Sequence, residues 1–258
     1  MQNIKTNIIY NMDCVSGMKL LADSSIDMVI TSPPYDDIRK YNGYSYDING
    51  VIKELYRVLK DGGVIIWVTA DAVHNGSETC TSFRTALKFV DNGFLLNDTM
   101  IYEKNNPMPQ GGKRYNQSFE YMFCFTKGKP KTFNPITEPT KYKGLANMKN
   151  RGKNGELIYR KVERKNTKKV GNVFKYSIGG GISTKDKVAF KHPAIFPEKL
   201  VHDQIITWSN ENDIILDPFM GSGTTAKTAK LNNRKYIGFE ISKEYCDICE
   251  ERLKLYSI

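Results

Sequence analysis

The sequence lacks the features that mark several classes of protein. Five cysteines in 258 residues are too few and too scattered for a disulfide framework. No run approaches the roughly 18 apolar residues that cross a bilayer, and residues 1–10 have no signal-peptide layout. We therefore expect a cytoplasmic protein without disulfides and without a membrane span.

Residues that bind metals are also scarce. There are three histidines, and the single Cys-x-x-Cys pair, Cys246 and Cys249, falls in a segment with a helical pattern. A structural zinc site needs about four ligands, and no second pair or nearby histidine supplies them. We expect no metal site.

Acidic residues are scarce in one part of the chain. Residues 127–191 contain 18 Lys and Arg against 4 Asp and Glu, whereas the rest of the chain contains 20 and 24. Such a block predicts a polyanionic partner, because neutralising phosphates releases counterions; a solvated insertion is the alternative. The candidate nucleic-acid contacts are cations of this block and of a preceding Gly-Gly-Lys-Arg loop: Lys113, Arg114, Lys141, Lys143, Arg151, Arg160, Lys168 and Lys169.

Strand-like runs alternate with amphipathic helical patterns outside this block. Strands are expected at 7–10, 28–31, 64–70, 95–103, 119–126, 213–217 and 236–240, and helices at 47–60, 78–91, 197–208, after Gly221, and at 243–256. Gly62 and Gly63 are expected to end the first helix. This order predicts an α/β fold with a mostly parallel sheet and helices on both faces. Residues 1–127 and 191–258 would form that domain, with 128–190 as a basic insertion.

A glycine turn follows the strand at 213–217. The sequence Asp-Pro-Phe-Met-Gly-Ser-Gly-Thr spans 217–224, and Glu240 ends the next strand. Ligands bind beyond the carboxyl ends of strands in open α/β sheets, and free N–H groups at a helix start favour polar groups. Glu240 is placed to accept two ribose hydroxyls, as in dinucleotide-binding folds. We expect a nucleoside-bearing cofactor; an ordinary glycine-bearing turn is the alternative.

A proline-rich loop follows the strand at 28–31. The sequence Thr-Ser-Pro-Pro-Tyr spans 31–35, and two successive prolines fix φ and favour extended backbone before them. The loop should rigidly present the Ser32 hydroxyl and the Pro33 carbonyl, with Tyr35 behind them. An ordinary exit from a sheet is the alternative.

The two motifs together resemble those of the DNA amino-methyltransferases, which modify N4 of cytosine or N6 of adenine. Their order along the chain resembles the β class, a circular permutation of the Rossmann-like methyltransferase fold. Further blocks that look like family blocks are Asn11-Met12-Asp13-Cys14, 105–109, 119–121 and 191–198. The basic block has no family pattern, as expected of a target-recognition region.

The resemblance implies S-adenosylmethionine as cofactor and double-stranded DNA as substrate. Ser32 and the Pro33 carbonyl would hold the amine of a flipped base, Pro34 would complete the rigid loop, and Tyr35 would stack on the base. The residues expected to bind the cofactor are Asp13, Thr31, His192, Pro193, Phe196, Asp217, Phe219, Gly221, Ser222, Gly223, Thr224 and Glu240.

The first position of the catalytic motif favours one base. A serine there resembles the N4-cytosine enzymes, whereas an aspartate would resemble most N6-adenine enzymes; C5 methylation would need a Pro-Cys pair, which the sequence lacks. The alternatives are N6-adenine methylation, methylation of RNA or protein, a non-catalytic DNA-binding protein and a nicotinamide-dependent oxidoreductase. Expected partners are a cognate restriction endonuclease and a second copy of the chain, in a prokaryotic or phage-infected cell, associated with the nucleoid.

Overall fold

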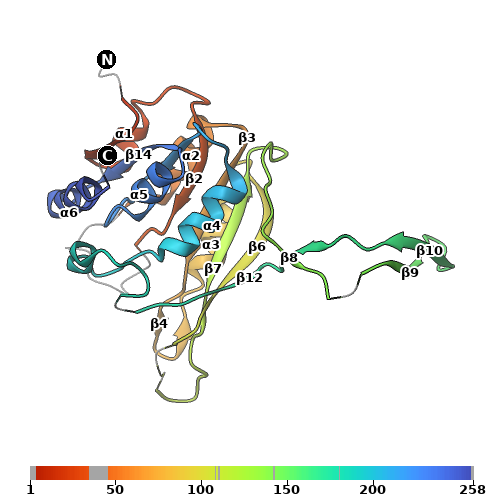
Figure 1. The fold of residues 1–258 in the computed structure, drawn as a ribbon. Coiled ribbons are helices and arrows are strands. Elements are labelled where there is room, and N and C mark those ends of the chain that lie inside the picture. The colour runs from red at the N-terminus through yellow and green to blue at the C-terminus, as the bar shows by residue number, and fades with distance from the viewer. Residues whose placement is uncertain are drawn as a thin grey trace. The chain divides into compact units, whose positions relative to one another are not determined.

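A central sheet of eight strands forms the core of the fold (Figure 1). The computed structural model describes residues 4–34, 46–107, 109, 111–141, 143–179 and 181–256. The strand order is β1–β14–β13–β2–β3–β7–β6–β12. Within the described residues, β7 is the only strand of this sheet that runs antiparallel to its neighbours. The bounds are β1 Ile8–Asn11, β2 Ile26–Thr31, β3 Leu59–Thr69, β6 Leu95–Lys104, β7 Phe119–Thr126, β12 Val173–Tyr176, β13 Ile214–Asp217 and β14 Lys235–Glu240.

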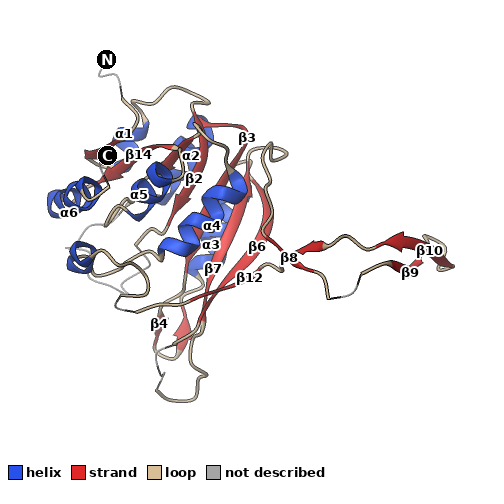
Figure 2. Cartoon of the chain, viewed as in Figure 1, coloured by secondary structure: helices blue, strands red, loops and turns tan. Residues whose placement is uncertain are grey.

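Helices cover both faces of the sheet, as Figure 2 shows. Successive side chains of a strand point to opposite faces, so Ile65 and Trp67 of β3 join one core while Ile66 joins the other. The first core also contains residues of α1 (Cys14–Met18), α2 (Ile48–Val58) and α3 (Thr81–Asp91). The second contains residues of α4 (Glu198–Trp208), α5 (Thr224–Leu231) and α6 (Lys243–Lys254). The expected α/β class is confirmed.

The C-terminal strands enter the middle of the sheet and bring the two motifs together. β13 pairs in parallel with β2, with Leu216 opposite Val29, and β14 lies between β13 and β1. The residues that follow β2, β13 and β14 therefore meet at one edge of the sheet, although almost 190 residues separate the ends of β2 and β13. This is the edge where parallel α/β sheets bind ligands.

The expected elements are present with small shifts at their ends, but the prediction that Gly62 and Gly63 end the helix at 47–60 is wrong. α2 ends at Val58 and β3 begins at Leu59, so the strand runs through Gly62 and Gly63. The reason is tertiary: the Gly62 N–H donates to the Lys127 carbonyl at 2.6 Å, and the Lys127 N–H donates to the Gly63 carbonyl at 3.2 Å. Further short elements are β4 (Val73–His74), β5 (Ser77–Glu78) and the 3-10 helix η1 (Lys187–Lys191).

Residues 135–171 form a separate small unit. In it β8 (Thr137–Pro139) pairs with β11 (Thr167–Lys169), and β9 (Leu145–Arg151) pairs with β10 (Leu157–Glu163), both antiparallel. None of its described residues is fully buried. The basic insertion expected at 128–190 is longer than this unit, because β12 and η1 belong to the larger unit. Among the described helices, none is long and apolar enough to cross a bilayer.

Candidate functional site

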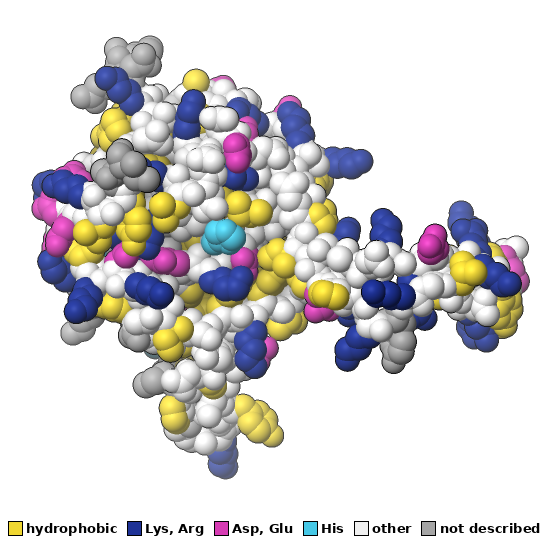
Figure 3. Space-filling view, viewed as in Figure 1, with side chains coloured by type: hydrophobic (Ala, Val, Ile, Leu, Met, Phe, Trp, Pro, Cys, Tyr) yellow, Lys and Arg dark blue, Asp and Glu magenta, His cyan; other side chains and the backbone are white. Residues whose placement is uncertain are grey.

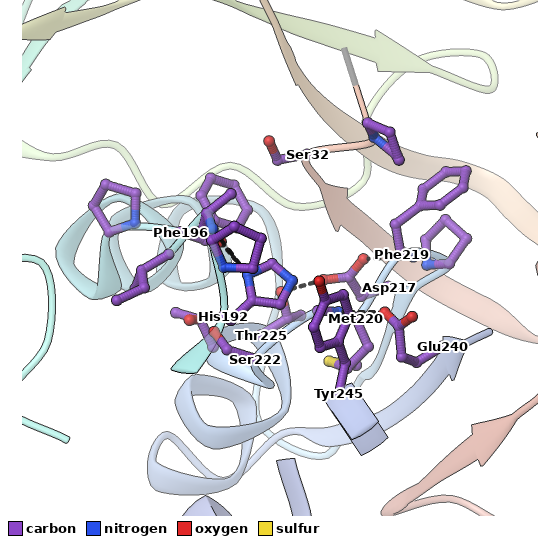
Figure 4. Close-up of a pocket in the computed structure, with 18 of the residues that line it drawn as sticks. Ser32, His192, Phe196, Asp217, Phe219, Met220, Ser222, Thr225, Glu240 and Tyr245 are labelled. Carbon is purple, nitrogen blue, oxygen red and sulfur yellow. Dashed lines mark hydrogen bonds between the residues drawn. The ribbon is translucent and has the colours of Figure 1, made fainter. Parts of the chain in front are cut away.

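A cavity of about 550 Å³ opens at the edge of the sheet where the two motifs meet. Its volume lies within the range of about 300–1,000 Å³ that is usual for small-molecule and cofactor sites. Most of the side chains expected at the site line it: Asp13, Ser32, Pro34, His192, Pro193, Phe196, Asp217, Phe219, Gly221, Ser222, Thr224 and Glu240. Ser32 lies apart from His192, Glu240 and Tyr245 in Figure 4.

The Asp217 carboxylate connects the two motifs. It accepts hydrogen bonds from Thr31 Oγ1 at 2.7 Å, from Thr225 Oγ1 at 2.6 Å and from the Phe219 N–H at 3.0 Å. Asp217 is only 2% exposed, and burial raises the pKa of its carboxyl to about 6 against the opposing effect of these bonds. Thr31 is fully buried and is not among the lining residues. Its hydroxyl thus fixes the backbone that leads into Ser32.

Glu240 has the acceptor capacity that a ribose requires. Its two carboxylate oxygens accept the N–H groups of Gly221 at 2.8 Å and Ser242 at 2.9 Å. A carboxylate offers about four acceptor positions, so acceptor capacity remains for hydroxyl groups. Burial raises the pKa of Glu240 above its usual value. Asp13, which lies between β1 and α1, lines the cavity. Its carboxylate caps α1 by accepting the Ser16 N–H at 2.8 Å.

The glycine turn offers fewer free N–H groups than its sequence implies. The N–H groups of Met220, Gly221 and Gly223 donate to the Phe239 carbonyl, to Glu240 and to the Met220 carbonyl. Gly221, at φ +52°, instead permits a close contact: a Cβ there would lie 3.1 Å from His192 Nε2. The turn therefore shapes the cavity wall by packing as well as by its backbone donors.

His192 belongs to that wall. Its Nδ1 lies 2.7 Å from the Ala194 carbonyl oxygen and 3.1 Å from the Ala194 nitrogen, and these contacts orient the ring. The ring centroid lies 4.3 Å from that of Tyr245 in an edge-on arrangement. Tyr245, on α6, lines the cavity and was not expected from the sequence. No local motif marks it, since it reaches the cavity only through the packing of α6.

A buried ionic cluster, formed by Asp186, Glu198, Lys227 and Arg252, supports the segment 183–198 that lines the cavity. Arg252 is fully buried and binds Asp186 at 2.7 Å and Glu198 at 2.6 Å, while Lys227 binds them at 2.8 and 2.6 Å. Arg252 also donates to the Ser222 carbonyl at 2.8 Å. Burial would raise the pKa of Asp186, but the hydrogen bonds from Lys227, Tyr256 and Arg252 lower it to about 2. The cluster holds the segment and the glycine turn in one arrangement.

An ion pair at another part of the cavity was also not expected. Lys104, at the end of β6, lies 2.6 Å from Glu120, at the start of β7, and both line the cavity with the largely buried Tyr102. Glu120 lies in the Phe-Glu-Tyr block, but that block alone indicates no partner. The antiparallel register, in which Tyr102 pairs with Glu120, brings the two charges together.

The remaining expected residues lie elsewhere. Pro33 and Gly223 are described but do not line the cavity, and Tyr35 lies outside the described residues. Lys113 and Arg114 lie in the loop between β6 and β7, where Arg114 forms an ion pair with Glu78. The other predicted DNA contacts are exposed residues of the 135–171 unit, over which cationic side chains are spread in Figure 3. They are Lys141, Lys143, Arg151, Arg160, Lys168 and Lys169.

Comparisons with known proteins agree with this arrangement. The family model for N6/N4 methyltransferases, described as DNA methylase, matches residues 26–251. The orphan methyltransferase M.BamHII of Bacillus amyloliquefaciens is 55% identical, over 92% of each chain. The type II methyltransferase M.BglII of Bacillus subtilis is 31% identical, over 96% of this chain and 69% of that protein.

A solved structure supports the assignment of the cofactor. The M1.HpyAVI–SAM complex superposes with a TM-score of 0.64 at 26% identity, over 95% of this chain and 98% of that one. The cavity fits the same cofactor, because it joins a carboxylate with spare acceptor positions to apolar and aromatic walls. The chain therefore belongs to the N6/N4 DNA methylase family and is an S-adenosylmethionine-dependent DNA methyltransferase of exocyclic amino groups.

Proposed function

We propose that the enzyme methylates N4 of a cytosine flipped out of double-stranded DNA. The observation that carries the proposal is Ser32, which lines the cavity directly after the buried Thr31. Serine at this motif position resembles the N4-cytosine enzymes. Because Asp217 holds Thr31 in place, the serine hydroxyl is presented on a fixed backbone.

The residues around the amine act by positioning and by hydrogen bonding. The lone pair of an exocyclic amine is delocalised into the base, so the nitrogen is a weak nucleophile. Acceptors at its N–H groups favour a tetrahedral nitrogen and orient its lone pair. The Ser32 hydroxyl, which lines the cavity, is proposed as one acceptor, and the carbonyl of Pro33, which lies between two lining residues, as the other. S-adenosylmethionine supplies the methyl group on a sulfonium centre. Pro34 stiffens the loop, and Tyr35 is proposed to stack on the base.

The cofactor is proposed to extend along the β13–β14 side of the cavity. Glu240 would accept its ribose hydroxyls and Asp13 would contact its adenine, while the turn 217–224 would hold the methionine portion. His192, Pro193 and Phe196, all of which line the cavity, would close over that portion. Lys104, Glu120 and Tyr102 are left to line the part that receives the base.

The cations of the small unit and of the loop between β6 and β7 are proposed to contact DNA. Residues 135–171 carry 11 Lys and Arg against 3 Glu, which is the charge balance that phosphate binding requires. In the cell the enzyme would act as a solitary modification enzyme, as the name of the orphan relative M.BamHII suggests, or as the protective partner of a restriction endonuclease.

Mass spectrometry of nucleosides tests the proposal directly. Unmodified DNA incubated with the enzyme and S-adenosylmethionine should yield N4-methylcytosine, whereas N6-methyladenine would refute the choice of base. Ser32→Ala should lower kcat about 100-fold, the usual cost of removing a positioned hydrogen-bonding group, without changing cofactor affinity. Ser25→Ala, just before the other end of β2, is the matched control and should retain wild-type turnover. Full activity of Ser32→Ala would refute the mechanism.

A further inference from the structure

The ribbon formed by β9 and β10 has two chemically different faces. Side chains alternate across an antiparallel ribbon, and the register places Lys149 opposite Tyr159, with Lys161 and Arg151 on the same side. We call this side, which also carries Leu145, Asn147, Leu157 and Glu163, the cationic face. The opposite face carries Ala146, Met148, Asn150, Ile158, Arg160 and Val162 and is mainly apolar.

The two faces also differ in burial. The two half-buried residues of the ribbon, Ala146 and Ile158, both belong to the apolar face. A hollow of about 660 Å³ within the same small unit is lined by Ala146, Met148 and Val162 of the apolar face and by Asn147 and Glu163 at the Leu145 end of the cationic face. Every residue of the cationic face is exposed, so its charged side chains are accessible to a partner.

Tyr159 lies at the centre of the cationic face. Its side chain is 65% exposed, and Lys149 Nζ lies 5.7 Å from its ring centroid. Arg151 is a diagonal neighbour across the ribbon, and Lys161 lies two residues further along the same strand. None of these three cations forms an ion pair with any residue in the described part of the chain. An aromatic ring surrounded by uncompensated positive charge suits a nucleic acid.

The dimensions of the ribbon select the groove. Seven paired residues at about 3.3 Å each span about 23 Å, which matches about seven base pairs at 3.4 Å per pair. A two-stranded ribbon fits the major groove, which is about 12 Å wide, without deforming the duplex, whereas the minor groove, about 6 Å wide, would have to be widened. Arginine and lysine bind guanine O6 and N7 in the major groove, and this is the commonest specific base contact.

We propose that the cationic face of the β9–β10 ribbon enters the major groove and reads base edges through Arg151, Lys149 and Lys161. Tyr159 packs against the groove between them. Arg160, on the opposite face of the same ribbon, is confined to phosphate contacts, which carry no sequence information. The proposal rests on the DNA methyltransferase activity and not on which base is methylated.

The experiment combines opposite-face variants with groove-specific base analogues. Sequencing of DNA modified by the wild-type enzyme first gives the recognition site, which is then placed in a short duplex. kcat/KM is measured for the wild type, Arg151→Ala and the matched control Arg160→Ala, on normal duplex and on duplexes with single 7-deazapurines. A 7-deazapurine removes only the N7 acceptor in the major groove, and inosine for guanine removes the amino group in the minor groove.

Arg151→Ala should lower kcat/KM about tenfold or more, while Arg160→Ala should lower it by less than about threefold. At one purine, 7-deaza substitution should lower kcat/KM of the wild type and of Arg160→Ala by a similar factor, with little further effect on Arg151→Ala. Lys149→Ala and Lys161→Ala should behave like Arg151→Ala at other positions. Unchanged thermal melting and cofactor affinity identify variants that are folded.

Two results would overturn the proposal. One is an equal loss for Arg151→Ala and Arg160→Ala; the other is a wild-type enzyme that is insensitive to every 7-deazapurine but sensitive to inosine. Detection of N6-methyladenine instead of N4-methylcytosine would refute the choice of base and leave this proposal standing, so the two failures are distinguishable.

Discussion

Thr31→Val tests how much the hydrogen bond between the two motifs contributes to stability and to turnover. Valine has nearly the shape of threonine, and Thr31 is fully buried, so the substitution removes one hydrogen bond with little change in packing. The lost bond is the one from Thr31 Oγ1 to the Asp217 carboxylate at 2.7 Å. Asp217 keeps its bonds from Thr225 and from the Phe219 N–H.

The expected cost depends on pH. A hydrogen bond to a charged group contributes about 1.5–3 kcal/mol, so the free energy of unfolding near pH 8 should fall by that amount and Tm by about 3–12 °C. In the wild type the pKa of Asp217 is raised from 3.8 to about 6, so its contribution to stability is present below pH 4 and is lost as the pH rises through 6. The Thr31 bond lowers this pKa, and the variant's value is therefore higher still. The difference between variant and wild type should be smallest near pH 5 and should grow towards pH 8.

Urea denaturation at pH 5, 6, 7 and 8 measures this difference, and kcat on DNA measures its consequence for the site. Thr225→Val removes an equivalent bond to the same carboxylate at 2.6 Å, from α5, and is the matched control. Both variants should lose similar stability, but Thr31→Val should lower kcat by about tenfold and by more than Thr225→Val, because Thr31 directly precedes Ser32. A cost that is independent of pH, or equal losses of kcat in the two variants, would refute the reasoning.

Three further predictions concern Gly223, Arg252 and Cys80 of the larger unit. Gly223→Ala should destabilise more than Gly144→Ala in thermal melting, because both have positive φ but only at 223 would the Cβ lie 3.1 Å from a neighbouring side chain. Arg252→Met should cost about 3–5 kcal/mol in urea unfolding near pH 7. That cost should shrink as the pH falls towards the Asp186 pKa of about 2; a constant cost would contradict the pairing. In the native enzyme the exposed Cys80 should react first with a thiol reagent, since burial raises the pKa of Cys14, Cys124 and Cys246 to about 12; mass mapping of the labelled peptides checks this.

Much of the sheet could be predicted because its signals are local. The apolar run at 119–126 predicted β7 with its observed bounds, and the runs at 28–31 and 213–217 predicted the strands that carry the two motifs. The glycine signal at 62–63 failed because a backbone partner at Lys127, distant in the sequence, outweighed the local tendency to end a helix.

Other site residues could not be predicted, because their roles come from pairing between distant segments. The ion pair of Lys104 and Glu120 exists because β6 and β7 are antiparallel in that register. Arginine is usually exposed to solvent, and only the packing of α6 buries Arg252 against Asp186. No periodicity or motif encodes either contact.

The sequence by itself determined the family, the cofactor and the order of the motifs, because short rigid segments carry that chemistry within a few consecutive residues. The tertiary structure decided that Asp217 holds the catalytic loop, that much of the glycine turn's hydrogen-bonding capacity is used internally, and which side chains share one face of the basic ribbon. These depend on the pairing of β2 with β13 and of β9 with β10, and pairing between distant strands is a property of the folded chain.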